Sequence, residues 1–164
     1  MDDSLISLRP IGLVRSRRVD LRDAFWGDAV AEVELSADLP ADSLDGLEAF
    51  SHAEIIYLFD RVAPEKVVMG ARHPRNNPAW PRVGIFAQGA KGRPNRLGST
   101  IVRIVSREGR RLRVLGLDAV DGTPVLDIKP VMAEFLPREP VRQPDWSREL
   151  MRDYWRPESE RGEG

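Results

Sequence analysis

The residues best suited to binding an anion lie between positions 84 and 100. This stretch reads GIFAQGAKGRPNRLGST, in which glycines allow close approach of the backbone to a ligand. Its three cations, Lys91, Arg93 and Arg96, can donate charge-assisted hydrogen bonds to carboxylate or phosphate groups. The pattern therefore predicts a loop shaped for an anionic ligand, and the alternative is a solvated basic hairpin loop.

Three carboxylates further along the chain are candidates for acid–base chemistry. Asp118, Asp121 and Asp127 lie in the apolar segment 116–130, although strand interiors disfavour aspartate. Buried charges need partners, so these groups form either an internal network with Lys129 or an arginine, or a ligand-facing turn. A carboxylate in a ligand-facing turn could accept a proton during a reaction.

Charge is unevenly distributed along the chain. Between Lys66 and Arg113 there are twelve lysines or arginines and one acidic residue, Glu108, whereas the rest of the chain holds twenty-five acidic and thirteen basic residues. The segregation favours a local surface for a polyanion, and ion pairs within the fold are the alternative. Residues 61–82 contain four prolines and no regular pattern, so we interpret them as an excursion enlarging this surface or as a mobile insertion.

Length and composition limit the class of protein. A chain of 164 residues suits one domain, and the lack of cysteine excludes disulfides, zinc–thiolate sites and cysteine nucleophiles. No apolar run reaches the ~18 residues that a membrane-spanning helix needs. Residues 1–4 lack the basic start of a secretory signal. We expect a cytoplasmic protein with neither a membrane segment nor a bound metal.

The elements that must position these residues are mostly strands. Period-two or apolar patterns predict strands over 7–15, 29–35, 53–59 (buried on both faces), 83–87, 100–105, 111–117 and 125–128. A short helix is expected over 40–50. A second, over 144–155, carries the stripe Trp146, Leu150 and Tyr154 and docks on the barrel or on a second subunit. The fold expected is all-β, a barrel or sandwich with small helical additions, divided into residues 1–143 and a C-terminal helix with a frayed polar tail over 144–164.

Four blocks of sequence carry a family resemblance. They are Pro10-Ile11-Gly12; Phe50-Ser51-His52; Gly84-Ile85-Phe86-Ala87 with Arg93-Pro94-Asn95 and Leu97-Gly98; and Gly116-Leu117-Asp118 with residues 121–130, DGTPVLDIKP. Over residues 8–131 the chain resembles the TsaA/YaeB family, whose characterised members are the TrmO tRNA methyltransferases. The resemblance implies a single-sheet β-barrel, usually a homodimer, that uses S-adenosyl-L-methionine. It also implies N6-methylation of threonylcarbamoyl-adenosine beside the tRNA anticodon.

The resemblance and the basic surface together define the expected site. The cofactor contacts would be Phe25, Trp26, Gly27, Phe59, Asp60, Gln88, Gly89, Lys91, Arg93, Ser99, Val120, Asp121, Gly122 and Thr123. The RNA contacts would be Arg72, His73, Arg75, Arg93, Asn95, Arg96 and Lys129. Phe25 and Trp26 either cover a flat ligand or plug one end of the core. Asp118, Asp121 and Asp127 are the candidate general bases.

The chain departs from the family pattern in its basic loop. Gly89 stands where the family has an arginine, and Lys91 can replace its charge but not its bidentate geometry. Arg96 stands where the family has a proline. Two alternatives therefore stay open: a methyltransferase of the same fold acting on a small molecule, and a non-catalytic S-adenosylmethionine-binding module.

Overall fold

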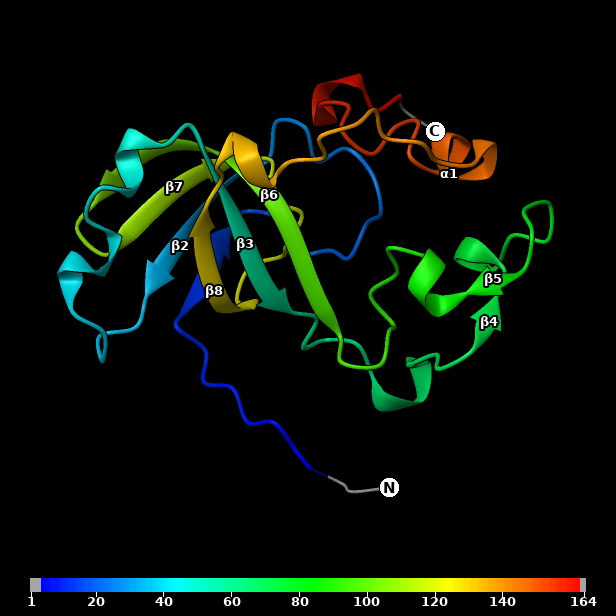
Figure 1. Ribbon diagram of the computed structural model, residues 1–164, viewed down its shortest axis with the longest axis horizontal. Helices are drawn as coiled ribbons and strands as arrows, with labels where there is room; N and C mark the ends of the chain where they lie inside the picture. The colour runs from blue at the N-terminus through cyan, green and yellow to red at the C-terminus, as the bar shows by residue number, and fades with distance from the viewer. Residues whose placement is uncertain (1–3, 163–164) are drawn as a thin grey trace.

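Six antiparallel strands form a closed barrel in the computed structural model, which describes residues 4–162 (Figure 1). In order around the barrel, the strands are β1 (Gly12–Ser16), β2 (Val30–Leu35), β7 (Arg111–Leu115), β6 (Leu97–Glu108), β3 (His52–Leu58) and β8 (Pro124–Pro130). The barrel closes where Gly12 and Leu13 of β1 pair with β8. The expected all-β, single-sheet barrel is confirmed. The interpretation of residues 1–3 as the start of a chain without a signal lies outside the described residues.

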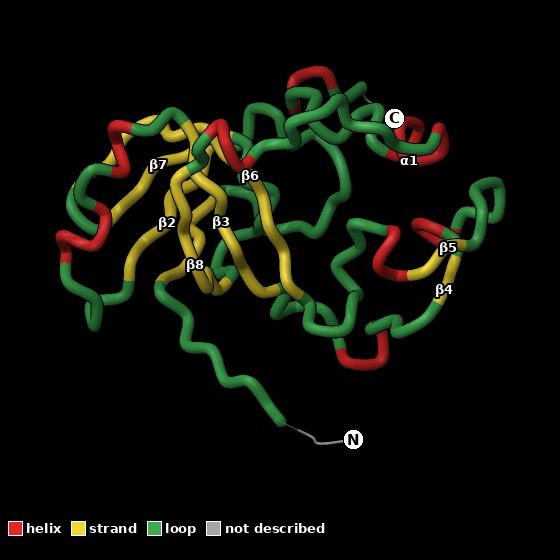
Figure 2. Tube along the Cα trace, in the orientation of Figure 1, coloured by secondary structure: helices red, strands yellow, loops and turns green. Residues whose placement is uncertain are grey.

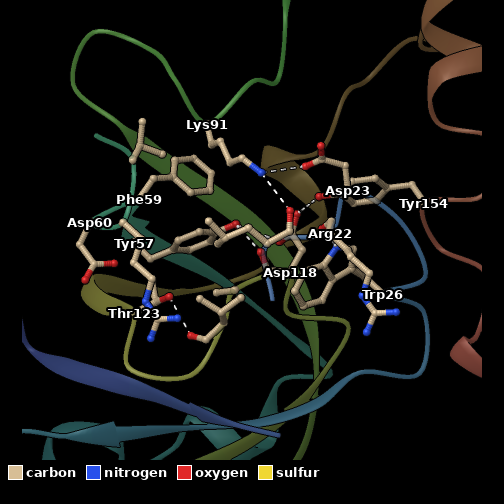
Figure 3. Close-up of a pocket in the computed structure, with 15 residues that line it drawn as sticks. Arg22, Asp23, Trp26, Tyr57, Phe59, Asp60, Lys91, Asp118, Thr123 and Tyr154 are labelled. Carbon is tan, nitrogen blue, oxygen red and sulfur yellow. Dashed lines mark hydrogen bonds and ion pairs between the residues drawn. The ribbon is translucent and has the colours of Figure 1, made fainter. Parts of the chain in front are cut away.

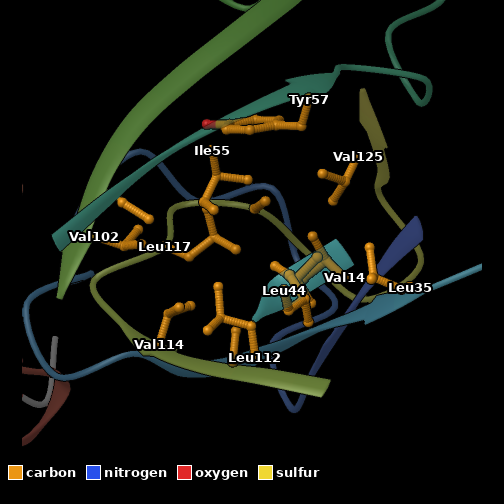
Figure 4. Close-up of a cluster of buried hydrophobic side chains, with 14 residues drawn as sticks. Val14, Leu35, Leu44, Ile55, Tyr57, Val102, Leu112, Val114, Leu117 and Val125 are labelled. Carbon is orange, nitrogen blue, oxygen red and sulfur yellow. The ribbon is translucent and has the colours of Figure 1, made fainter. Parts of the chain in front are cut away.

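Alternation along the strands fills the barrel with apolar side chains (Figure 4). On β3, for example, Ala53, Ile55 and Tyr57 are buried, whereas the residues between them are only half-buried. Residues of one strand face point into the barrel and those of the other face outward, as the pleat requires. The expectation that this strand is buried on both faces is therefore wrong, because no second layer covers the outside of the barrel here.

The segment between β3 and β6 forms a small lobe beside the barrel (Figures 1 and 2). It contains a two-stranded hairpin of β4 (Ala71–Arg72) and β5 (Val83–Gly84) and three 3-10 turns. The turns are η3 (Pro64–Lys66), η4 (Pro74–Asn76) and η5 (Ile85–Ala87). The strand expected over 83–87 is thus only two residues long. The excursion expected over 61–82 is present, and its prolines open two of the turns.

The helices are shorter than the sequence pattern predicts. Residues 40–50 form two 3-10 turns, η1 (Ala41–Leu44) and η2 (Leu47–Ala49), with Gly46 in the left-handed conformation between them. In the C-terminal segment, α1 (Asp145–Leu150) ends after six residues and turns follow. Two further 3-10 turns are η6 (Ala133–Phe135) and η7 (Glu158–Glu160). Among residues 4–162, no helix is long and apolar enough to cross a membrane.

The end of the chain is held against the barrel. Glu158 accepts hydrogen bonds from Arg18 at 2.7 Å and from Arg22 at 2.8 Å, and its backbone nitrogen donates to Asp28. The expectation of a frayed tail from residue 156 is therefore wrong up to residue 162. The contacts that anchor this tail join residues about 140 positions apart, so a local pattern in the sequence cannot predict them.

Candidate active site

A pocket opens at the mouth of the barrel, where β3, the loop after β7 and the loop after β1 meet (Figure 3). Aromatic side chains alternate with carboxylates and cations around it, and its enclosed part measures about 70 Å³. It is lined by Leu21, Arg22, Asp23, Trp26, Tyr57, Phe59, Asp60, Arg61, Val62, Lys91, Asp118, Ala119, Val120, Thr123 and Tyr154. This mixture suits a ligand that has both an apolar and a charged part.

Asp118 is the acceptor of a hydroxyl network in the pocket. Its Oδ1 accepts hydrogen bonds from Tyr57, at 2.9 Å, and from Thr100, while Oδ2 accepts one from Tyr154. Burial, and then the neighbouring Asp118 carboxylate, raise the pKa of Tyr57 and Tyr154 well above the usual 10.0. Both phenols therefore stay protonated at any physiological pH, and they orient the carboxylate as donors.

Gly98 makes room for this network. A Cβ atom at position 98 of β6 would collide with the ring of Tyr57, which lies opposite it on β3. Tyr57 also packs edge-on against Phe59, with ring centroids 5.3 Å apart. Glycine at position 98 therefore leaves the space that the Tyr57 ring needs to reach Asp118.

The loop after β1 supplies one wall of the pocket through Trp26. This side chain is 3% exposed, its Nε1 donates to the Arg22 carbonyl, and the Arg18 guanidinium stacks 3.9 Å from its ring centroid. Trp26 is buried, as expected for a side chain that plugs one end of the core, and its ring also lines the pocket. Phe25 adopts a positive φ of 64° and lies next to the pocket without lining it.

The turn after β7 brings Val120 and Thr123 to the pocket. Thr123 is buried and its hydroxyl donates to the Val120 carbonyl at 2.7 Å, which closes the turn, and Gly122 takes the left-handed conformation that the turn requires. Asp121 faces away from the pocket interior, since its carboxylate accepts from the Ser16 backbone at 3.0 Å. Asp121 thus joins the turn to β1.

The structure brings together about half of the predicted cofactor residues. Those that line the pocket are Trp26, Phe59, Asp60, Lys91, Val120 and Thr123. Ser99 lies on the outer face of β6, where its hydroxyl donates to Glu54 at 2.5 Å. Gln88 is buried under the β4–β5 hairpin and donates to two backbone carbonyls, and Arg93 donates to the Gln88 carbonyl. Gly27 packs against the backbone of Trp155, and Gly89 lies in the lobe outside this pocket.

The three candidate bases have different environments. Asp118 lines the pocket, Asp121 braces the turn, and Asp127 is exposed on the outer face of β8, 3.9 Å from Lys129. Of the three candidate bases, Asp118 is therefore the one whose side chain lines the pocket. Asp127 and Lys129 do form an ion pair, but the pair is exposed to solvent and not internal as expected.

Sequence reasoning missed the two tyrosines of the pocket. Tyr57 looked like an ordinary apolar strand residue, and Tyr154 looked like part of a docking stripe on a helix. A signal was available, because a buried tyrosine needs a partner for its hydroxyl group. The partner, Asp118, is 61 residues from Tyr57 and 36 from Tyr154, so only the fold identifies it.

Most predicted RNA contacts also have structural partners. His73 Nδ1 lies 2.8 Å from the Trp80 carbonyl oxygen, Arg75 donates to the Asp23 carbonyl and Arg96 to the Val62 carbonyl. Asn95 is exposed in the lobe. Lys129 is on the barrel, on the outer face of β8. These residues thus do not form one continuous surface, and the lobe carries most of them.

Part of the central basic segment pairs with the acidic body. Arg107 lies 2.6 Å from Asp45, Arg111 lies 3.6 Å from Glu34, and Lys91 lies 3.2 Å from Asp23. These pairs are largely exposed, and such pairs contribute about 0–1 kcal/mol each. Ion pairing within the fold therefore accounts for part of the basic segment, and the polyanion surface stays a prediction. Within residues 4–162, no histidines, aspartates and glutamates gather as a potential metal site.

The pocket residues fit the chemistry of S-adenosyl-L-methionine. Phe59, which is less buried than Trp26 and Tyr57, offers an aromatic ring to an adenine or to a sulfonium cation, and Asp60 offers a charge of opposite sign to its amino group. Lys91 at the rim suits a carboxylate. An enclosed volume of about 70 Å³ holds only a few water molecules, so the side chains at the rim must move for a nucleoside-sized ligand to enter.

The fold and the site define the class of protein, which is a closed six-stranded β-barrel with a ligand pocket at its mouth. The sequence pattern of the tRNA-methyltransferase O N-terminal domain matches residues 22–135 of this chain. The chain therefore belongs to the TrmO family, as its motifs led us to expect, and S-adenosyl-L-methionine-dependent methyl transfer is the chemistry of that family.

Known proteins similar to this chain agree with that assignment. A probable S-adenosyl-L-methionine-binding protein of Pyrococcus abyssi is 36% identical over 143 residues, which cover 84% of this chain and 74% of that protein. The human tRNA (adenine(37)-N6)-methyltransferase is 37% identical over 105 residues, 64% of this chain and 23% of that protein. The crystal structure of TrmO from Pseudomonas aeruginosa superposes with a TM-score of 0.66 at 30% identity, covering 85% of this chain and 62% of that chain. This chain thus spans less than two thirds of the last two proteins.

Proposed function

We propose that this chain is an S-adenosyl-L-methionine-dependent methyltransferase that methylates N6 of an adenosine next to the anticodon of tRNA, with threonylcarbamoyl-adenosine as the modified form it accepts. The observation that carries the proposal is the Asp118 network at the mouth of a TrmO-family barrel. The name of the human relative supports the tRNA position. The threonylcarbamoyl group comes from the family resemblance and is the finer part of the proposal.

The cofactor supplies, when bound, a methyl group on a sulfonium leaving group that needs little further activation. Trp26, Tyr57, Phe59 and Lys91 would hold it, and their main contribution is alignment of donor and acceptor. Such alignment can lower a barrier by about 7–11 kcal/mol. A site that works in this way needs few catalytic side chains.

Asp118 is suited to remove the proton that the acceptor nitrogen must lose. In threonylcarbamoyl-adenosine, N6 is a urea nitrogen whose lone pair is delocalised, so a base increases its reactivity. The cofactor would supply the methyl group that N6 receives, and the Asp118 carboxylate would take up the proton that N6 loses. Tyr57 and Thr100 hold Oδ1 in place during this step, which leaves Oδ2 for the substrate once Tyr154 moves.

The lobe between β3 and β6 is the surface that we assign to tRNA. Arg75, Arg82 and Asn95 are exposed on it, and such contacts go mainly to phosphates. The structure of the lobe suggests that Arg93 and Arg96 stabilise its loops through backbone carbonyls instead.

Methyl transfer to defined tRNA pools tests the proposal. The protein is incubated with labelled S-adenosyl-L-methionine and tRNA that either carries or lacks threonylcarbamoyl groups, and nucleosides are then separated. We expect label in a methylated threonylcarbamoyl-adenosine from the first pool alone. Label in neither pool, with cofactor binding intact by calorimetry, would favour a small-molecule substrate or a binding module.

A homodimer is part of the proposal. The resemblance implies two copies, and an exposed apolar face is available for the second. The face lies on β6 and the segment after β8 and comprises Ile101, Met132, Phe135 and Leu136. Phe135 is 87% exposed, which is unusual for an aromatic side chain next to other apolar groups.

A further inference from the structure

A second hollow lies on the far side of Tyr154 from the active pocket. It is a groove of about 440 Å³ between the β4–β5 lobe and the C-terminal segment, which face each other in Figure 1. From the lobe it is lined by Arg72, Pro74, Arg75, Asn76 and residues 87–91, and from the C-terminal segment by Trp146, Ser147, Leu150, Met151 and Tyr154. Its volume is within the range of small-molecule sites.

Arg72 is the one groove cation whose guanidinium has no acceptor within the described part of the chain. Its Nε is buried without a partner, and its terminal nitrogens make no hydrogen bond or ion pair there. The other two cations are satisfied, since Arg75 donates to the Asp23 carbonyl and Lys91 to Asp23 and Leu21. Because Arg72 lines the groove, its terminal nitrogens are free to donate to an acceptor that enters the groove.

The chemistry of Arg72 indicates what this acceptor is. A guanidinium presents planar paired donors that match a carboxylate through two parallel hydrogen bonds. On the opposite side of the groove, Trp146 and Tyr154 offer aromatic side chains, on which proteins commonly stack bases that are not paired. The groove thus combines a place for a base with a place for a carboxylate.

The groove is next to the active pocket. Asp23, Lys91 and Tyr154 line both hollows, so the two adjoin at these side chains. Methyl transfer needs donor and acceptor atoms within about 3–3.5 Å of each other. Two adjoining hollows, one for each ligand, would let the reacting atoms meet at the position of Tyr154.

We propose that the groove receives the acceptor nucleoside and that Arg72 binds the carboxylate of its N6 substituent. Arg72 is then a specificity-determining residue, because an adenosine without the substituent leaves the guanidinium unpaired. The inference rests on the proposed function for the identity of the substrate. It also replaces the phosphate contact expected for Arg72 from the sequence with a contact to the substituent itself.

Direct binding of the nucleoside tests the role of Arg72 without turnover. Calorimetry would compare free threonylcarbamoyl-adenosine with its carboxamide analogue, which has no charge, on wild type, Arg72→Gln and Arg82→Gln. Arg82 is the matched control because it is an exposed arginine of the same lobe that does not line the groove. We expect Arg72→Gln to weaken binding of the acid about 10- to 100-fold and binding of the carboxamide less than about twofold.

Two further comparisons make the result decisive. Arg72→Lys should bind the acid with intermediate affinity, because it keeps the charge and loses the fork, and melting temperatures of all variants show whether they are folded. The inference is overturned if wild type does not bind the nucleoside, binds acid and carboxamide equally, or if Arg72→Gln and Arg82→Gln lose the same affinity. Failure of the proposed function shows differently, as selective nucleoside binding without methyl transfer to tRNA.

Discussion

Asp118, Asp121 and Asp127 are alike in sequence context but not in role. All three occur in one fifteen-residue segment, yet one faces the pocket, one braces a turn and one lies on the outer surface of β8. Asp127 is on strand β8, whereas Asp118 and Asp121 are in the loop between β7 and β8, so the path of that loop decides where their carboxylates point. The three candidate bases are therefore distinguished by their environments and not by their residue type.

Replacing Asp118 should affect the reaction more than the binding of the cofactor. We expect Asp118→Asn to lower kcat about 10²- to 10⁴-fold, the usual contribution of a positioned acid or base, with cofactor affinity within a few-fold of wild type. Steady-state kinetics and calorimetry on the same protein measure the two effects.

Asp127→Asn is the matched control for this change. It removes the same charge from the outer face of the barrel and should leave kcat unchanged. Equal losses in the two variants, or full activity of Asp118→Asn, would contradict the assignment of Asp118 as general base.

Two elements far apart in sequence build one wall of the pocket. The backbone nitrogens of Phe25 and Trp26 donate to the carbonyls of Asp153 and Tyr154 at 3.0 and 2.8 Å, and Glu158 pairs with Arg18 and Arg22. The C-terminal segment thus positions Tyr154 over Asp118. Since Tyr154 also borders the groove, the docking of this segment controls both hollows.

Acid should release the C-terminal segment. The hydrogen bond from Arg22, more than any other contact, lowers the pKa of Glu158 below its usual 4.5. Its contribution to docking is therefore complete above about pH 4.5 and is lost as pH falls through the lower value in the folded protein. Limited proteolysis from pH 7 to pH 3 should reveal cleavage after residue 150 before the barrel itself unfolds.

Substitution of Glu158 separates this effect from general acid denaturation. Glu158→Gln should already be cleaved faster at pH 7. Glu160→Gln should behave as wild type, because Glu160 pairs only with Arg156 on the same segment. Resistance of Glu158→Gln to cleavage at pH 7 would mean that backbone contacts alone hold the segment.

At the scale of the whole molecule, the apolar face around Phe135 predicts a dimer. Burying this face against a second copy would remove a large aromatic surface from water. We expect Phe135→Glu to convert a dimer into a monomer in sedimentation velocity experiments. Phe86→Glu, at a similarly exposed position in the lobe, should stay dimeric. A monomeric wild type at micromolar concentration would rule the dimer out.

The role of the segregated charges also depends on the fold of the whole molecule. A basic segment in an acidic chain predicts a polyanion surface, and the fold divides its arginines among ion pairs, backbone carbonyls and free surface positions. Arg107 and Arg111 stabilise the barrel, whereas Arg72 lines a groove. Counting charges cannot make this division, because partners are set by which segments become neighbours.

Local patterns in the sequence determined the barrel strands and the family. Alternating apolar residues marked β2, the Asp121-Gly122 turn marked the start of β8, and the motif blocks identified the TrmO family. These features depend on neighbours a few residues apart, and so they are legible in the chain itself. Trp26, Phe59 and Thr123, which the family resemblance implied as cofactor contacts, line the pocket, and their contact with the cofactor stays a prediction.

Only the tertiary structure decided how the site is assembled. In the folded protein, Asp118 accepts hydrogen bonds from Tyr57 and Tyr154, and Glu158 pairs with Arg18. Helix α1 ends at Leu150, and Tyr154 lies in the turns that follow it. The fold places Ser99 and Asp127 on the outside of the barrel. Each of these outcomes depends on contacts between segments tens of residues apart, whose register is set by packing of the closed sheet and has no local signature in the sequence.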